Sequence, residues 1–256
     1  MKKSLMIVLT VLALTSICAA AAADKYDFLK PMWLNALENM QEIREEGVSR
    51  EYREPNVVCG DEQLEVVRYA VYMEDEYDPE AYLYAELKNT GEQVIRINGA
   101  SLTVLDASGK RLSECEYVTA KPDVVMPGSS LFIMEWMYDF VSDLSRVDSI
   151  QITLEYSEYS RKKIEALNET RAYVDGDYLY AEVTNTTEKP LFEIGVSAVA
   201  LDKDGKILDM LCEETYSGVG AAPGSTIVFR KMLDQRALDT TGVVCEAEAY
   251  VYDERY

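Results

Sequence analysis

Four tyrosines in two matching segments are the residues best suited to bind a ligand. The segment Tyr82-Leu83-Tyr84 recurs 96 positions later as Tyr178-Leu179-Tyr180, in a chain that holds 18 tyrosines. A tyrosine combines a large apolar ring with a hydrogen-bonding hydroxyl, which suits protein interfaces and sugar-binding platforms. We expect all four to point away from the core and to form a binding surface: Tyr82, Tyr84, Tyr178 and Tyr180. The alternative is cross-strand pairing that stabilises a sheet face.

A cluster of acidic residues offers a second chemistry. Glu74, Asp75, Glu76 and Asp78 lie close together between two expected strands. Carboxylates are the hard oxygen ligands that Ca²⁺ prefers. Their spacing matches no defined calcium loop, so a solvated loop is the alternative. We expect no cofactor apart from this candidate calcium site.

The chain contains no histidine. This excludes Ser-His and Cys-His nucleophile pairs, as well as metal sites ligated by imidazole. Paired carboxylates can hydrolyse glycosidic bonds. With 46 acidic residues in the chain, however, such pairs arise without functional meaning. We therefore predict a non-enzymatic protein.

The first residues have the pattern of an export signal. Lys2 and Lys3 precede an apolar stretch, and Ala19 to Ala23 supply the small residues of a cleavage site. The apolar stretch is shorter than the ~20 residues of a spanning helix. We predict a signal peptide over 1–23 and a secreted, extracellular protein of the cell envelope. The alternatives are an uncleaved anchor and a lipoprotein modified at Cys18, although the large Ile17 disfavours lipidation.

The charge of the chain restricts its partners. The net charge is −21, and removal of Lys2 and Lys3 leaves 23 basic residues against 46 acidic ones. Such a field repels nucleic acid and anionic lipid headgroups. We expect no nucleic-acid partner and no membrane insertion once the signal is cleaved. The expected partner is an extracellular protein or a glycan.

Four cysteines follow the signal peptide. They are Cys59, Cys115, Cys212 and Cys245. An even number in an exported chain suggests disulfides, and three pairings are possible. One bridge in each domain would join Cys59 to Cys115 and Cys212 to Cys245. This pairing is a hypothesis that rests on domain membership.

An internal repeat is the strongest pattern in the chain. Residues 82–134 and 178–230 share 19 identities in 53 positions without a gap. A period of 96 indicates duplicated domains, because solenoid units repeat every ~20–50 residues. The shared residues include Asn-Thr after the first strand, a Leu-Asp…Gly-Lys turn and a Pro-Gly-Ser turn.

Each copy has the pattern of a β-sandwich. Apolar residues alternate with polar ones, as in Leu83, Ala85 and Leu87, and regular turns separate the strands. We predict an all-β fold of two tandem immunoglobulin-like β-sandwich domains. The expected layout is a signal peptide at 1–23, an amphipathic helix and polar linker at 24–58 with the linker over 48–58, and domains at 59–158 and 159–256. The second domain is expected to open with one strand over 163–173. The helix would pack on the first domain or, alternatively, on a partner.

The repeated motifs resemble the FxLYD domain, a small module of exported bacterial proteins. The resemblance covers about 62–158 and about 163–256. In the segments that end at Asp106 and Asp202, aliphatic residues replace the aromatic ones of the family name. The resemblance implies an immunoglobulin-like sandwich, and it carries no catalytic residues.

We therefore expect a non-enzymatic extracellular binding or interaction protein built from duplicated modules. The alternative is a structural or spacer component of the bacterial cell envelope, stabilised by calcium if the acidic cluster binds it.

Overall fold

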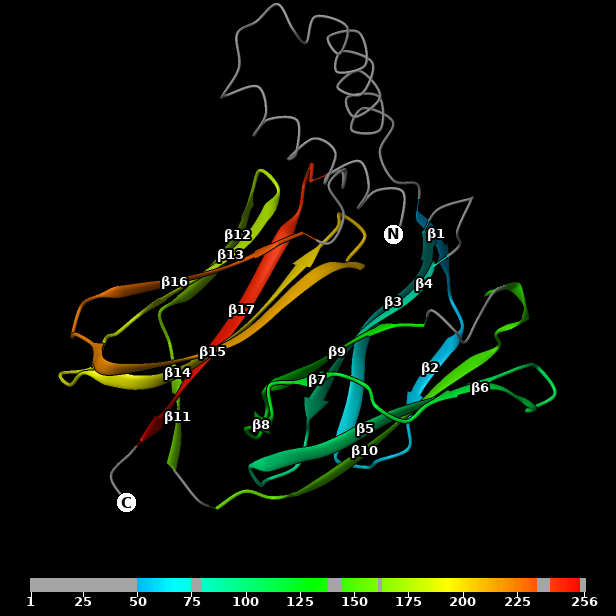
Figure 1. The fold of residues 1–256 in the computed structure, drawn as a ribbon, viewed down its shortest axis with the longest axis horizontal. Coiled ribbons are helices and arrows are strands. Elements are labelled where there is room, and N and C mark those ends of the chain that lie inside the picture. Colours follow the sequence, from blue (N-terminus) through cyan, green and yellow to red (C-terminus); the bar gives the residue numbers. More distant parts are fainter. Residues whose placement is uncertain (1–49, 75–79, 138–143, 161–162, 234–239, 254–256) are drawn as a thin grey trace, which may run out of the picture. The chain divides into compact units, whose positions relative to one another are not determined.

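The computed structural model describes residues 50–74, 80–137, 144–160, 163–233 and 240–253. These residues form an all-β fold with four sheets (Figure 1) and one short 3₁₀ turn, η2 (Leu144–Arg146). None of them belongs to a helix long and apolar enough to cross a membrane. The predicted signal peptide over 1–23 and the predicted helix after it lie outside the described residues.

Two sheets come from the first half of the chain. Sheet A has the strand order β1-β3-β4-β9-β7, and sheet B has the order β2-β10-β5-β6, with β8 also paired to β5. Their strands are β1 (Arg50–Arg53), β2 (Asn56–Cys59), β3 (Leu64–Glu74), β4 (Glu80–Asn89), β5 (Ile95–Leu105), β6 (Arg111–Cys115), β7 (Ala120–Lys121), β8 (Val124–Val125), β9 (Ser130–Trp136) and β10 (Ser149–Glu158). We call this pair of sheets the first sandwich.

The other two sheets come from the second half. Sheet C has the order β11-β17-β14-β15, and sheet D has the order β12-β13-β16. Their strands are β11 (Lys163–Leu167), β12 (Thr170–Asp175), β13 (Tyr178–Thr184), β14 (Leu191–Leu201), β15 (Ile207–Ala221), β16 (Thr226–Met232) and β17 (Val244–Asp253). We call this pair the second sandwich. The prediction of an all-β fold with sandwiched sheets is confirmed.

The alternating residues fill the two cores. Leu83 and Leu87 of β4 are fully buried between sheets A and B, and Leu179 and Val183 of β13 are fully buried in the core of the second sandwich. Side chains of a strand point to opposite faces in turn, so alternate apolar residues cover one face. Burying a Leu or Val side chain stabilises the fold by roughly 1.5–3 kcal/mol.

The same hydrogen bonds close the turns in both sandwiches. Asn89 is buried, and its side-chain Nδ2 donates to the backbone oxygens of Gln93 and Val125. Asn185, 96 positions later, is also buried and donates to the oxygens of Lys189 and Ala221. Each asparagine amide thereby links two backbone carbonyls, 4 and 36 positions further along the chain, and buried polar groups need such partners. This explains the Asn of the Asn-Thr motif in both copies.

Two sequence assignments were wrong. Residues 48–58 were expected to be a polar linker, yet they contain β1 and most of β2, and Val57 is buried in the first core. The range 163–173 was expected to hold one opening strand, but it holds two strands in different sheets. The chain turns sharply between them, where the hydroxyl of Thr170 donates to the Leu167 oxygen.

The cysteines do not form the predicted bridges, because all four are free thiols. Cys59 and Cys115 lie on opposite edge strands of sheet B, and Ile152 and Leu102 stand between them in the same row. Three strand spacings of ~4.8 Å separate their backbones by roughly 14 Å, whereas a disulfide needs Cα atoms within about 7 Å.

The second predicted bridge fails in the same way. Strand β14 lies between Cys212 and Cys245, which pair with Ser197 and Ala200 of that strand. The two cysteines are thus two strands apart and three residues out of register. Shared domain membership could not reveal this separation, because it depends on the strand order of the sheet.

Alkylation without reductant tests this result. Under denaturing conditions, we expect one alkyl group on each of the four residues Cys59, Cys115, Cys212 and Cys245, read by peptide mass. In the folded protein at pH 8, Cys212 should react slowest, because burial raises the pKa of its thiol to about 12 and the thiolate is the reacting form. Any pair of cysteines that resists alkylation in the denatured chain would restore the disulfide hypothesis.

Candidate binding face

The outer face of sheet D gathers the tyrosines of the second copy. Leu179 and Ala181 of β13 point into the core, so Tyr178, Tyr180 and Glu182 point outward. Neighbouring strands add three more side chains to this face. We call the whole set the tyrosine face: Arg171 and Tyr173 of β12, Tyr178, Tyr180 and Glu182 of β13, and Arg230 of β16.

The aromatic rings of this face contact one another, one pair stacked and the other tilted by 50°. Tyr173 and Tyr180 stand opposite each other, and their ring centroids are 5.1 Å apart with planes at 11°. Tyr178 continues the row at 6.1 Å from Tyr180. A guanidinium group lies over each end of the row. Arg171 lies over Tyr173 and Arg230 lies over Tyr178, each with its guanidinium carbon 5.3 Å from the ring centroid. Cation–π contacts of this kind hold the rings in place.

Glu182 fixes one end of the face. Its carboxylate accepts from Arg171 Nε at 2.7 Å and from the Tyr173 hydroxyl at 2.9 Å. These two hydrogen bonds lower the pKa of Glu182, with the larger effect from Arg171. The hydrogen bond between Tyr173 and Glu182 also raises the pKa of Tyr173, so the Tyr173 hydroxyl stays protonated and donates. The side chains are therefore ordered before any ligand arrives.

The equivalent face of sheet A is covered. Tyr84 was expected to be exposed, and this was wrong, because Tyr84 and its neighbour Tyr72 have no exposed surface. Tyr82 is partly buried and stacks on Tyr72 at 5.3 Å. These rings pack in one cluster with apolar side chains of β14 and β15, namely Val199, Leu201, Ile207 and Met210.

The sequence of β14 indicated that this strand packs against something on both of its faces, as it does against the tyrosines of sheet A. Strand β14 is buried on both faces from Ile194 to Leu201, and such strands read as near-continuous apolar runs instead of alternating ones. At the equivalent of Val199 the first copy has Thr103. The two tyrosine pairs therefore have different environments. Sequence reasoning also missed Arg171, Tyr173 and Arg230, because only the register of sheet D brings them beside Tyr178 and Tyr180.

The candidate calcium residues are not brought together in the part of the chain that the structure describes. Glu74 is the last residue of β3, and Asp75, Glu76 and Asp78 lie outside the described residues. Among the described side chains, no group of three or more Asp, Glu, Cys or His could hold a metal ion. The calcium site thus stays a prediction.

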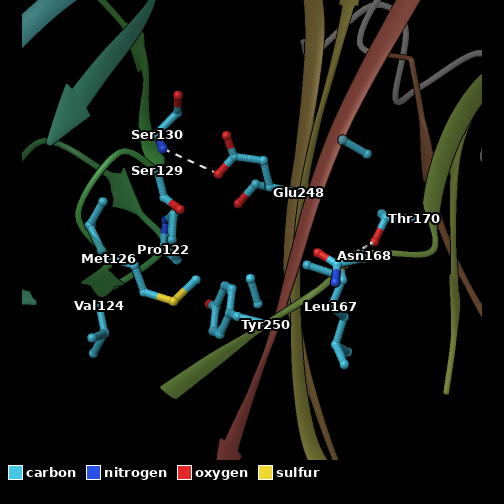
Figure 2. A pocket seen from close by; sticks show the side chains of 15 residues that line it. Pro122, Val124, Met126, Ser129, Ser130, Leu167, Asn168, Thr170, Glu248 and Tyr250 are labelled. Carbon is cyan, nitrogen blue, oxygen red and sulfur yellow. Dashed lines mark hydrogen bonds between the residues drawn. The ribbon is translucent and has the colours of Figure 1, made fainter. Parts of the chain in front are cut away.

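One cavity of about 260 Å³ lies next to residues 122–130 and strands β11, β14 and β17. Figure 2 shows Glu248 pointing toward Ser130, whose backbone N–H donates to the Glu248 carboxylate at 3.3 Å. The hydroxyl of Tyr250, which also lines the cavity, donates to Glu214, which does not line it. The lining therefore supplies one carboxylate among apolar, hydroxyl and amide side chains, whereas acid–base catalysis on sugars uses two.

Comparisons with known proteins leave the family open. No known family profile matches the sequence, and no curated protein matches it. Among solved structures, a red sea bream transglutaminase is 10% identical, with a TM-score of 0.21; the match covers 84% of this chain and 31% of the transglutaminase. The Vibrio cholerae secreted serine protease VesC is 11% identical, with a TM-score of 0.16; the match covers 86% of this chain and 54% of VesC. This chain thus spans about a third and about half of their lengths. Similarities this low carry no functional argument.

Proposed function

We propose that this chain is an exported, non-enzymatic binding protein that recognises an extracellular protein through the tyrosine face. The observation that carries the proposal is the ordered row of Tyr173, Tyr178 and Tyr180 with an arginine over each end. Tyrosine and arginine are the side chains that dominate binding energy at protein interfaces. The duplicated immunoglobulin-like modules of the FxLYD type, secreted after signal cleavage, would present this face outside the cell.

The first sandwich supports a protein partner over a glycan. Its equivalent face carries Tyr72, Tyr82 and Tyr84, and β14 and β15 of the same chain cover it. A tyrosine-rich face of this module thus already packs on a sheet surface within the molecule. On sheet D, the exposed side chains Val228 and Met232 extend the tyrosine face with apolar area. Met, Tyr and Arg are enriched in the cores of protein interfaces.

Serine substitutions at Tyr178 and Tyr180 test the proposal. We expect the double variant to lose at least about tenfold in affinity for a partner captured from envelope extract, because each tenfold corresponds to about 1.4 kcal/mol and removal of one tyrosine hot spot costs about 2 kcal/mol. Binding would be measured by surface plasmon resonance, with thermal unfolding as a check on folding.

Tyr117→Ser is the matched control, because Tyr117 is exposed in the first sandwich and lies outside the tyrosine face. Equal affinity of the double variant and this control would refute the proposed face. A glycan array run in parallel would reveal a sugar ligand instead. Absence of saturable binding to either would support the alternative, a structural or spacer component of the cell envelope.

A further inference from the structure

Strand β16 forms an edge of sheet D, and its outer side has no strand partner among the described residues. Sheet D has the order β12-β13-β16, so β16 pairs with β13 alone. The N–H of Leu233 donates to the Asp177 oxygen on the β13 side. Backbone groups alternate in direction along a strand. The N–H and C=O groups of Val228, Arg230 and Met232 therefore point to the open side.

The first sandwich fills the equivalent edge with its own chain. Strand β9 corresponds to β16, and β7 pairs with it through Ala120 opposite Ile133 and Lys121 opposite Phe132. The N–H of Met134, the counterpart of Arg230, donates to the Thr119 oxygen in this pairing. The structure thus contains a direct example of a short extended segment bound at this position of the module.

Local sequence explains why the second sandwich leaves the edge open. In the first sandwich the β6 pairing with β5 ends at Cys115, β7 then pairs with β9, and Pro122, which follows β7, has no N–H to donate to a ladder. The second copy has Ser217 and Gly218 at the positions of Lys121 and Pro122. There β15 stays paired with β14 as far as Ala221, opposite Leu191, with a register shift after Tyr216. Within the described part of the second sandwich, no segment crosses over to pair with β16.

The charge of the edge indicates the chemistry of its partner. Strand β16, with the sequence TIVFRKM, has two cationic side chains and no acidic one, in a chain of net charge −21. Lys231 is already paired with the buried Asp209 at 2.7 Å. Arg230 is exposed beside Tyr178 and remains available to a carboxylate. At the covered edge of the first sandwich, the counterpart of Lys231 is Glu135, which has the opposite charge.

We propose that the open edge of β16 binds an extended, acidic segment of another protein as an added antiparallel strand. The segment places a small apolar side chain opposite Phe229, as Ala120 does opposite Ile133, and a carboxylate beside Arg230. Main-chain hydrogen bonds to Val228 and Arg230 supply affinity, and the alternate side chains supply specificity. The inference deepens the proposed function, because it names the part of the partner that lies next to the tyrosine face.

A synthetic peptide of alternating glutamate and valine, as long as the 7-residue β16, tests the proposal by fluorescence anisotropy with the full chain. We expect saturable binding that weakens with salt. Val228→Pro removes an N–H on the open side and leaves the β13 ladder intact, so it should reduce affinity at least about tenfold. Val228→Thr keeps the N–H and should recover most of that loss. Circular dichroism would verify that both variants fold.

Three controls separate the explanations. A peptide N-methylated at alternate residues and a lysine–valine peptide should not bind, and Tyr216→Ser, on exposed β15 of the same sandwich, should leave binding unchanged. Peptide binding that Val228→Pro does not weaken would overturn the proposal. The proposal would also be overturned if no peptide binds and the chain instead forms a dimer that Val228→Pro dissociates, because the occupant of the edge would then be a second copy.

The two proposals can fail separately. If Tyr178→Ser/Tyr180→Ser abolishes capture of the partner and Val228→Pro does not, the tyrosine face is supported and the added strand is refuted.

Discussion

Asn185→Asp should destabilise the second sandwich by roughly 3–5 kcal/mol. The side-chain Nδ2 of Asn185 donates to the backbone oxygens of Lys189 and Ala221 at 2.8 and 2.7 Å, and the residue has no exposed surface. The substitution keeps the shape and replaces the donor with a carboxylate oxygen that faces two carbonyl oxygens. Each buried group left unsatisfied costs about 1–3 kcal/mol, and more when it is charged. Urea unfolding would measure the loss.

Asn98→Asp is the matched control. It adds the same negative charge at an exposed position whose amide donates to the Ser157 hydroxyl at 3.3 Å, so its effect should stay within about 0.5 kcal/mol. Asn89→Asp should reproduce the large loss in the first sandwich. If Asn185→Asp and Asn98→Asp unfold at the same urea concentration, the asparagine bonds do not carry the stability assigned to them.

Gly195→Ala should destabilise the chain by about 2–4 kcal/mol. Gly195 lies opposite Tyr250 across β14 and β17, and a Cβ at this position would lie 2.1 Å from Cζ of that ring. The ring is 4% exposed, and its hydroxyl donates to Glu214 at 2.7 Å, so it has little room to move. Overpacking of a buried site costs about 1–3 kcal/mol, and the displaced hydrogen bond adds to it. Differential scanning calorimetry would report the shift in Tm.

The first sandwich provides the control for this glycine. Gly99 occupies the equivalent position opposite Glu155, and a Cβ there would meet its closest atom at 3.7 Å, an ordinary contact. Gly99→Ala should therefore change the stability by less than about 1 kcal/mol. A similar Tm for the two alanine variants would contradict the view that Tyr250 packs against the backbone of Gly195.

The elements that local residues determine could be predicted from the sequence. Alternation placed Leu83, Leu87, Leu179 and Val183 in the cores, where all four are fully buried. The Pro-Gly motif predicted a turn, and Ser129 N donates to Met126 O across it while Gly128 adopts a φ of 80°. In both cases the physical cause lies within a few residues, either in side-chain alternation or in turn geometry.

Features that depend on contacts distant in sequence could not be predicted in this way. Tyr84 and Tyr180 occupy the same place in the repeat, yet Tyr84 is buried because strands β14 and β15 cover it. The candidate site was predicted in part, since Tyr178 and Tyr180 do lie on an outer face. Its cations and Tyr173 come from strands β12 and β16, and only the pairing register places them there. The predicted cysteine pairing was wrong, because the distance between two cysteines of one sheet depends on the strand order, which the sequence pattern does not give.

Hydroxyl-radical footprinting, read by mass spectrometry in the presence and absence of envelope extract, tests the binding face most directly. We expect extract to lower the oxidation of Tyr173, Tyr178 and Tyr180, while the exposed Tyr117 and Tyr216 keep their full labelling. Unchanged oxidation of the three face tyrosines, together with protection of Tyr117 or Tyr216, would contradict the proposed binding face.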